Sequence, residues 1–167
     1  MTKSQWSGKT SLLENWYTQS MQKRLIPIVI LVAYSALVIN VLVFKNLPEI
    51  RVGHMMFRFG GTQAGQANLV PFKSILSYLR GQRGQLIGLI NIVGNIALLV
   101  PIGFIVPFVF RNMTWKKALI LAIAIGLALE ILQAVFHVGI FDIDDVILNA
   151  LGVMIGYGVC SMFTKRV

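Results

Sequence analysis

Four long apolar segments constrain this chain more than any other feature of its sequence. They cover residues 25–44, 86–110, 118–136 and 146–163, and each approaches or reaches the roughly 20 residues with which a helix crosses a bilayer. Hydrophobic residues make up 56% of the chain and charged residues 13%, about half the charged share of a soluble domain. We therefore expect an all-α membrane protein, built as a bundle of four transmembrane helices.

Basic residues near the ends of these segments predict the orientation, because cytoplasmic loops carry an excess of Lys and Arg. Such residues precede the first segment, link the second to the third and follow the fourth: Lys3, Lys9, Lys23, Arg24, Arg111, Lys116, Lys117, Lys165 and Arg166. We expect both termini in the cytoplasm. Residues 1–24 would form an N-terminal segment that is either interfacial or disordered, residues 25–163 the membrane domain and residues 164–167 a tail.

The loop over residues 45–85 carries six basic residues, which this orientation places outside the cell. Long loops follow the rule less strictly. Within this loop Phe72, Ile75, Leu76 and Leu79 recur at helical spacing. The pattern predicts a short interfacial helix between the first two transmembrane helices. Its cations would bind lipid headgroups: Lys73, Arg80 and Arg83.

The formal net charge of +9 raises the question of a nucleic-acid partner. The basic residues lie between apolar runs and form no stripe of their own, so we expect no nucleic-acid binding. Anionic lipid headgroups attract each cation beside a membrane by about 1 kcal/mol and are the expected partner. The single cysteine, Cys160, excludes an internal disulfide and is typical of a small buried helix residue.

Glu130 is the one ionisable side chain well inside an apolar segment, and such groups are usually functional. Polar and small residues share one helical face in three segments: Gly88, Asn91 and Asn95; Gly126, Glu130, Gln133 and His137; Asp145, Asn149, Gly152, Gly156 and Cys160. Glu130 would lie about 20 Å from the inner end of its helix, level with the other two faces. We expect an outward-opening pocket with these ligand-binding candidates: Asn91, Asn95, Glu130, Gln133, Asp145 and Asn149.

Helix packing is the alternative for these groups, since Asn and Gln form hydrogen bonds between transmembrane helices. Gly152 and Gly156 form a GxxxG pair that suits close contact between helices. That contact lies either within the chain or in a homo-oligomer formed through the Gly152/Gly156 face.

Three aspartates follow the third segment: Asp142, Asp144 and Asp145. They could bind a divalent cation, but their spacing lacks the calcium-loop pattern. Asp144 or Asp145 can instead cap the fourth helix and favour its dipole. We predict no metal and no cofactor. The sequence leaves open whether the protein is an enzyme; if it is, Glu130 and the three aspartates are the catalytic candidates.

Four elements in this chain resemble the VanZ-like family. They are N-L-V-P-F over residues 68–72, a segment over 91–103 with G-N and P-I-G, E-I-L-Q over 130–133, and F-D-I-D-D with N-A-L-G over 141–152. The resemblance covers about residues 25 to 163. Many members have an arginine just before F-D-x-D-D, where this chain has Val138, Gly139 and Ile140, so a mechanism built on that arginine does not carry over.

The resemblance implies a bacterial plasma-membrane protein of a family linked to resistance to teicoplanin and related lipoglycopeptides. It adds Asn68 and Pro71 to the ligand-binding candidates. Our first hypothesis is that the protein binds or modifies a lipid-linked envelope component at the outer leaflet. One alternative is a non-catalytic partner that assembles with other membrane proteins. A small transporter or flippase subunit is a third hypothesis, which is disfavoured because no charged residue lies in the inner half of any span.

Overall fold

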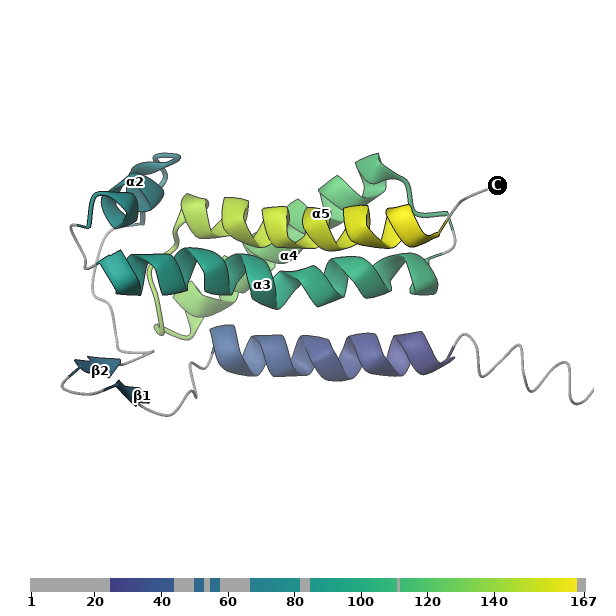
Figure 1. The fold of residues 1–167 in the computed structure, drawn as a ribbon, viewed down its shortest axis with the longest axis horizontal. Coiled ribbons are helices and arrows are strands. Elements are labelled where there is room, and N and C mark those ends of the chain that lie inside the picture. The colour runs from purple at the N-terminus through teal and green to yellow at the C-terminus, as the bar shows by residue number, and fades with distance from the viewer. Residues whose placement is uncertain are drawn as a thin grey trace, which may run out of the picture.

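The computed structural model describes residues 25–43, 50–52, 55–57, 67–81, 85–110 and 112–164. Within these ranges the chain forms four helices that are long and apolar enough to cross a membrane (Figure 1). They are an N-terminal helix, Leu25–Leu42, followed by α3 (Gln85–Val109), α4 (Trp115–Val135) and α5 (Ile143–Phe163). The expected all-α fold with four membrane-spanning helices is confirmed.

Two short strands and a short helix lie between the N-terminal helix and α3. Strands β1 (Ile50–Val52) and β2 (Met55–Phe57) pair antiparallel, with Ile50 opposite Phe57. Helix α2 (Lys73–Leu79) is the short helix predicted from the apolar spacing, although it ends before residue 86. The hairpin could not be predicted from the sequence, because three-residue strands are too short to show a clear alternation.

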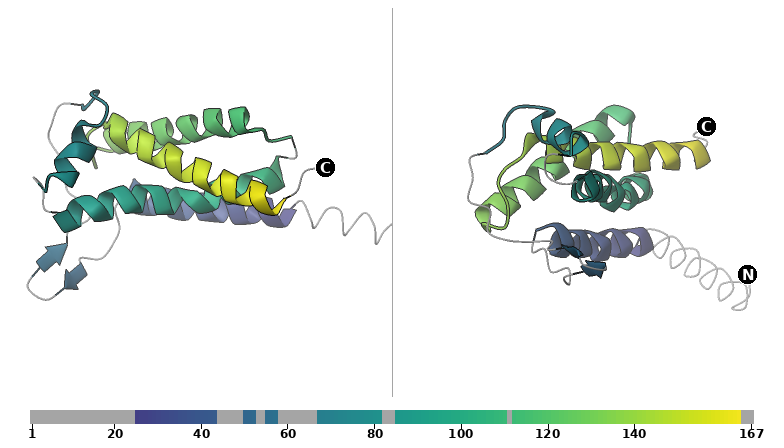
Figure 2. Two further views of the ribbon diagram at one scale, coloured as in Figure 1. Left: turned by 45° about the horizontal axis from the view of Figure 1, so that its top comes forward. Right: turned by 60° about the vertical axis from the view of Figure 1, so that its left-hand side comes forward.

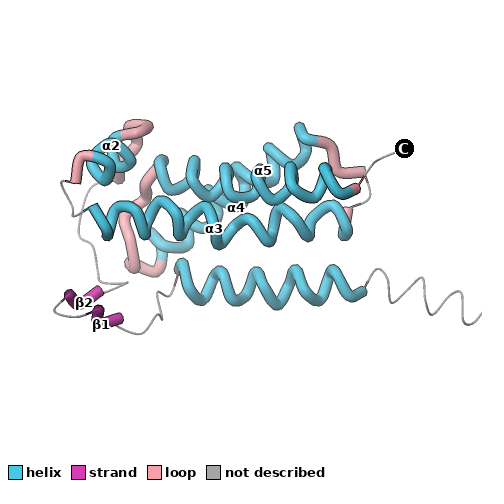
Figure 3. Tube along the Cα trace, viewed as in Figure 1, coloured by secondary structure: helices cyan, strands magenta, loops and turns pink. Residues whose placement is uncertain are grey.

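The four long helices alternate in direction, and α5 packs against both α3 and α4 (Figure 2). At one end of the bundle lie the first residues of α3 and α5 and the last residues of α4 and the N-terminal helix. Helix α2 lies at this end as well (Figure 1). We call this end the polar end. The α4–α5 connection lies there, and the short α3–α4 connection lies at the opposite end (Figure 3).

Helices α3 and α5 approach one another through glycines. A Cβ atom placed on Gly156 would lie 2.0 Å from the Val100 carbonyl oxygen, and one on Gly103 would lie 1.9 Å from the Val153 carbonyl oxygen. Gly152 is as tight, with its would-be Cβ 2.3 Å from the Ile96 oxygen. Only glycine leaves room for backbones this close. We call this set, Gly103, Gly152 and Gly156, the glycine contact.

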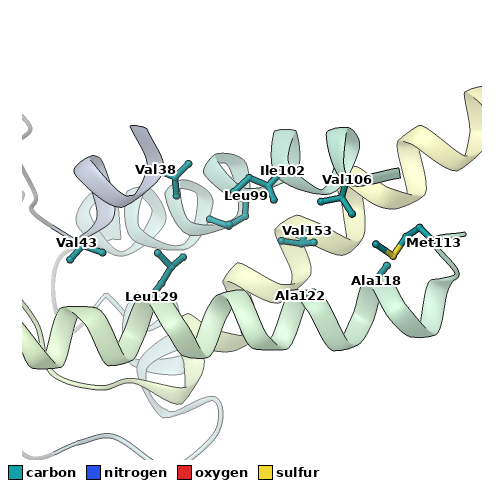
Figure 4. Close-up of a cluster of buried hydrophobic side chains, with 10 residues drawn as sticks. All are labelled: Val38, Val43, Leu99, Ile102, Val106, Met113, Ala118, Ala122, Leu129 and Val153. Carbon is teal, nitrogen blue, oxygen red and sulfur yellow. The ribbon is translucent and has the colours of Figure 1, made fainter. Parts of the chain in front are cut away.

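Apolar side chains fill the space between the long helices (Figure 4). The buried cluster contains Val38, Val43, Leu99, Ile102, Val106, Met113, Ala118, Ala122, Leu129 and Val153. Pro101 and Pro107 lie inside α3, which continues through both to Val109. Prolines are tolerated in membrane helices because neighbouring groups satisfy the freed carbonyls.

Hydrogen bonds from Tyr34 and Gln133 join the N-terminal helix to α3 and α4. The Tyr34 hydroxyl donates to the Leu98 carbonyl of α3 at 3.1 Å. The Gln133 side-chain amide of α4 donates to the Leu42 carbonyl at 2.9 Å. Leu42 lies in the last turn, where helix carbonyls lack intrahelical partners, so Gln133 satisfies one of them.

Candidate functional site at the polar end

Asp142 forms the start of α5. Its backbone is extended, and its side chain accepts a hydrogen bond from the Asp144 N–H at 3.0 Å, so Asp142 is the N-cap. The prediction of a cap at Asp144 or Asp145 is wrong. Both of those residues lie in the first turn, where their negative charge favours the helix dipole.

The Asp142 carboxylate also joins α5 to the segment before α2. Asn68 donates from Nδ2 to Asp142 Oδ1 at 2.9 Å, and the Ser74 hydroxyl donates to Asp142 Oδ2. The two backbones pair as a parallel bridge: the Asn68 N–H donates to the Phe141 carbonyl, and the Ile143 N–H donates to the Asn68 carbonyl. Asn68, a predicted ligand-binding residue, is buried here and makes protein contacts.

Asp144 is fully buried and holds the beginning of α2. Its two carboxylate oxygens accept hydrogen bonds from the backbone N–H groups of Phe72, Ser74 and Ile75, with distances of 2.7 Å from Ser74 and 3.1 Å from Ile75. Phe72, at the N-cap of α2, has a left-handed backbone with φ 66° and offers no side-chain cap. A carboxylate from α5 therefore caps α2 from outside the helix, which fixes α2 to the bundle.

Glu130 lies on α4 with 1% of its surface exposed. Its Oε2 atom accepts a hydrogen bond from the Asp142 N–H at 2.9 Å. The carboxylate that the sequence singled out therefore contacts the beginning of α5, on the buried side of the bundle. Glu130 is therefore buried within the bundle and does not face lipid.

The polar residues of α3 and α5 lie in two layers below this end. Asn91 donates to Asp145 Oδ1 at 3.3 Å, which joins the two helices. One turn further along each helix lie Asn95, 8% exposed, and Asn149, 2% exposed. The expected faces of α3 and α5 thus meet through the Asn91–Asp145 pair.

Gln133 and His137 were both assigned to the polar face of α4, and the structure places them differently. Gln133 is buried and serves as a link to the N-terminal helix, as the packing alternative expected. His137 lies beyond the end of α4 with φ 56° and is exposed, so it does not share the helical face assigned to it. The helix ends at Val135, which the sequence pattern could not show.

The surface of α2 combines apolar and basic side chains. The exposed apolar side chains of α2 and the segment before it are Leu69, Val70, Phe72, Leu76 and Leu79. Lys73, Arg80 and Pro71 are exposed as well. Arg83, the third predicted headgroup contact, lies outside the described residues. Exposed leucine and phenylalanine beside cations are typical of a helix at a membrane surface.

Ser74 is a residue that the sequence analysis missed. It is 7% exposed, its hydroxyl donates to Asp142, and it accepts from Asn68 Nδ2 at 3.0 Å. A lone serine in an amphipathic segment carries no distinguishing signal. Only the return of α5 to this segment, more than 60 residues later, gives Ser74 its role.

Gly152 and Gly156 lie against α3 of the same chain. The face proposed for a homo-oligomer is therefore covered while this packing lasts. A homo-oligomer stays a prediction, and it would need another surface. Within the described ranges, no group of three or more metal-ligating side chains lies close enough together to hold an ion.

The arrangement of Asn68, Glu130, Asp142 and Asp144 brings three of the four sequence elements together at the polar end, and comparison with known proteins agrees with the resemblance. The chain matches the VanZ/LLP1 family over residues 17–164. This chain belongs to the VanZ/LLP1 family. A curated relative is Protein VanZ of Enterococcus faecium, 25% identical over 76 residues, which are 46% of this chain and 47% of the relative. The alignment thus spans about half of that VanZ protein, and no solved structure matches.

The family elements now have physical roles in this chain. N-L-V-P-F carries Asn68 and the turn into α2, E-I-L-Q supplies Glu130, and F-D-I-D-D supplies the two carboxylates that join α5 to α2. These VanZ-family elements therefore describe a folded polar end. The structure assigns no reaction to them.

Proposed function

We propose that this VanZ-family protein binds the phosphate-bearing headgroup of a lipid-linked envelope component at the outer leaflet. The observation that carries the proposal is the surface of α2. Lys73 and Arg80 are exposed there beside the apolar side chains of Phe72, Leu76 and Leu79. Such a surface suits a headgroup phosphate above and acyl chains below.

The buried carboxylates support this role because they hold α2 in place. A free seven-residue helix would not be stable in water. Asp144 supplies acceptors to the N–H groups at the start of α2, and Asp142 binds Ser74. A binding surface that is already ordered loses less entropy when a lipid arrives. The predicted orientation, with both termini in the cytoplasm, puts α2 on the outer side.

The test is the lipid that co-purifies with the protein. The double substitution Lys73→Gln and Arg80→Gln removes two cations, worth about 1 kcal/mol each near an anionic surface. We expect roughly a 30-fold loss of affinity for the bound component, measured by mass spectrometry as lipid per protein. The matched control is Lys116→Gln with Lys117→Gln, two exposed cations at the opposite end. Equal lipid content in all three proteins would contradict the proposal.

A modifying reaction is the stronger form of this proposal. Asp142 and Asp144 hold α2, which leaves Glu130 and Asp145 as the carboxylates to test as a general base. Asp145→Asn and Glu130→Gln would then change the chemical form of the co-purified lipid as well as its amount. An unchanged chemical form in both variants would restrict the function to binding.

A contribution to teicoplanin resistance is the cellular form of the proposal. Expression in a susceptible host would then raise teicoplanin tolerance, and the Lys73/Arg80 double substitution would abolish the gain. Full tolerance with that double substitution would separate resistance from headgroup binding.

A further inference from the structure

Two asparagines in the membrane part of the bundle form no side-chain hydrogen bond with any other described residue. Asn149 on α5 is 2% exposed, and its Oδ1 atom accepts no hydrogen bond from any described residue. Asn95 on α3 is 8% exposed, and no hydrogen bond joins its side chain to the described part of the chain. Buried polar groups in proteins are nearly always paired, so each such group requires an explanation.

The two amides lie at the same level between α3 and α5. The helices run in the same direction, and Asn91 and Asp145 form a hydrogen bond across them at 3.3 Å. Asn95 and Asn149 each follow that pair by four residues, which is about one helical turn. Below them, the would-be Cβ of Gly152 is 2.3 Å from the Ile96 carbonyl oxygen, so the backbones close again. These two contacts bracket the amides along α3 and α5, and the Asn149 Oδ1 atom is buried there.

We propose that Asn95 and Asn149 form a buried site for one hydroxyl group, supplied either by a water molecule or by a ligand. An amide oxygen needs a donor, and an amide NH₂ needs an acceptor. A hydroxyl group is the smallest group that offers both. This site does not depend on headgroup binding by α2.

The surrounding charges disfavour an ionic guest. Asp145 lies one turn above on α5, and the buried Glu130 carboxylate contacts the start of the same helix. An anion would be repelled by these carboxylates. An ammonium group has donors only and would leave the Asn95 and Asn149 NH₂ groups unpaired. A neutral hydroxyl can donate to one amide oxygen and accept from the NH₂ group of the other amide, and it adds no charge to the membrane interior.

The test compares Asn149→Leu with the matched control Asn40→Leu, since Asn40 is an exposed asparagine on the N-terminal helix. Thermal unfolding is measured twice for each protein, in detergent after delipidation and in nanodiscs of native lipid. With a hydroxyl in place, Asn149→Leu removes one of that hydroxyl's two amide partners, leaves it bonded to Asn95 alone, and lowers Tm by about 2–4 °C. Asn95→Leu should shift Tm in the same direction, and Asn40→Leu should change it by less than about 1 °C.

The two preparations separate the sources of the hydroxyl. A lower Tm in both identifies a water molecule, and a lower Tm only in native lipid identifies a ligand. A raised or unchanged Tm in both preparations overturns the proposal, because removing an unpaired buried amide should stabilise the protein or leave it unaffected. Should either leucine variant fail to fold, a crystal structure of the unsubstituted protein in a lipid mesophase decides. Density within hydrogen-bonding distance of both amides supports the site, and its absence there overturns it.

Discussion

The polar end and the glycine contact hold the same bundle together by different means. At the polar end, Asp144 and Asp142 accept hydrogen bonds from α2 and the segment before it, and Glu130 accepts one from the start of α5. At the glycine contact, α3 and α5 touch backbone to backbone with no side chain between them.

The difference follows from the solvent. In a bilayer, apolar side chains gain little by facing one another, because acyl chains are equally apolar. Specific packing must therefore come from close approach or from hydrogen bonds. The glycine contact relies on close approach and lies deeper in the bundle. The polar end relies on hydrogen bonds, where the chain leaves the helices.

Gly156→Leu is expected to have the largest effect. Even the first side-chain carbon would lie 2.0 Å from the Val100 oxygen, which is backbone and cannot move aside. We expect a loss of about 5 kcal/mol or more, close to the whole stability of a small domain. Fluorescence-detected size exclusion would show little folded protein.

The matched control is Gly158→Leu, two residues further along α5, where a Cβ would meet nothing within 4 Å. This variant should fold, and leucine should favour the helix by roughly 1 kcal/mol relative to glycine. Equal behaviour of the two leucine variants would show that α3 does not lie against Gly156.

Asp144→Ala is expected to come second. The substitution leaves the N–H groups of Phe72, Ser74 and Ile75 without their acceptor, at a cost of about 3–5 kcal/mol if all stay buried. If α2 instead detaches from the bundle, these N–H groups reach water and the loss of stability is smaller. Hydrogen exchange should become fast over residues 72–79 and stay slow around Leu99 and Ile102 in the core. Unchanged protection over residues 72–79 would contradict this role for Asp144.

Ser74→Ala should cost about 1–2 kcal/mol, because the hydroxyl bonds both Asp142 and Asn68. Ser161→Ala is the matched control, since Ser161 is exposed and bonds the Gly158 carbonyl of its own helix. That control should lie within about 0.5 kcal/mol of the unsubstituted protein. Equilibrium unfolding of both variants in mild detergent measures the difference, and equal values would remove Ser74 from the polar end.

Tyr34→Phe is expected to have the smallest effect, about 0.5–1 kcal/mol, from loss of the hydroxyl bond to the Leu98 carbonyl. Tyr157→Phe on α5 removes a hydroxyl for which no hydrogen bond to a described residue is seen, and it should be nearly neutral. A pair of cysteines, one on the N-terminal helix and one on α3, should cross-link more slowly in Tyr34→Phe, because the two helices are then held together less tightly. Identical cross-linking rates in the two variants would contradict an anchoring role for Tyr34.

The spans and their inward faces could be predicted from the sequence, because hydropathy and helical spacing act within one segment. Glu130, Asn149, Gly152 and Gly156 are all buried, as expected. The cap of α5 was misplaced by two residues, because Asp142 and Asp144 are both good caps and only the fold chooses between them.

What the sequence could not show is which partner each polar group takes. Asp144 was considered as a cation ligand or as the cap of the fourth helix, and it instead caps α2, some 70 residues earlier in the chain. Ser74 and Asn68 likewise form hydrogen bonds with Asp142, which lies a similar number of residues away in the sequence. Such pairings depend on how α5 returns to the loop before α3, which local pattern does not encode.

The most direct test of this account measures whether α2 is fixed to the bundle by Asp144. Spin labels at Leu79 of α2 and Ile131 of α4, both exposed, would be introduced with Cys160→Ser, and their separation measured by pulsed electron resonance in nanodiscs. We expect a narrow distance distribution in the otherwise unsubstituted protein and a broad one with Asp144→Ala. A broad distribution in both, or a narrow one in both, would contradict it.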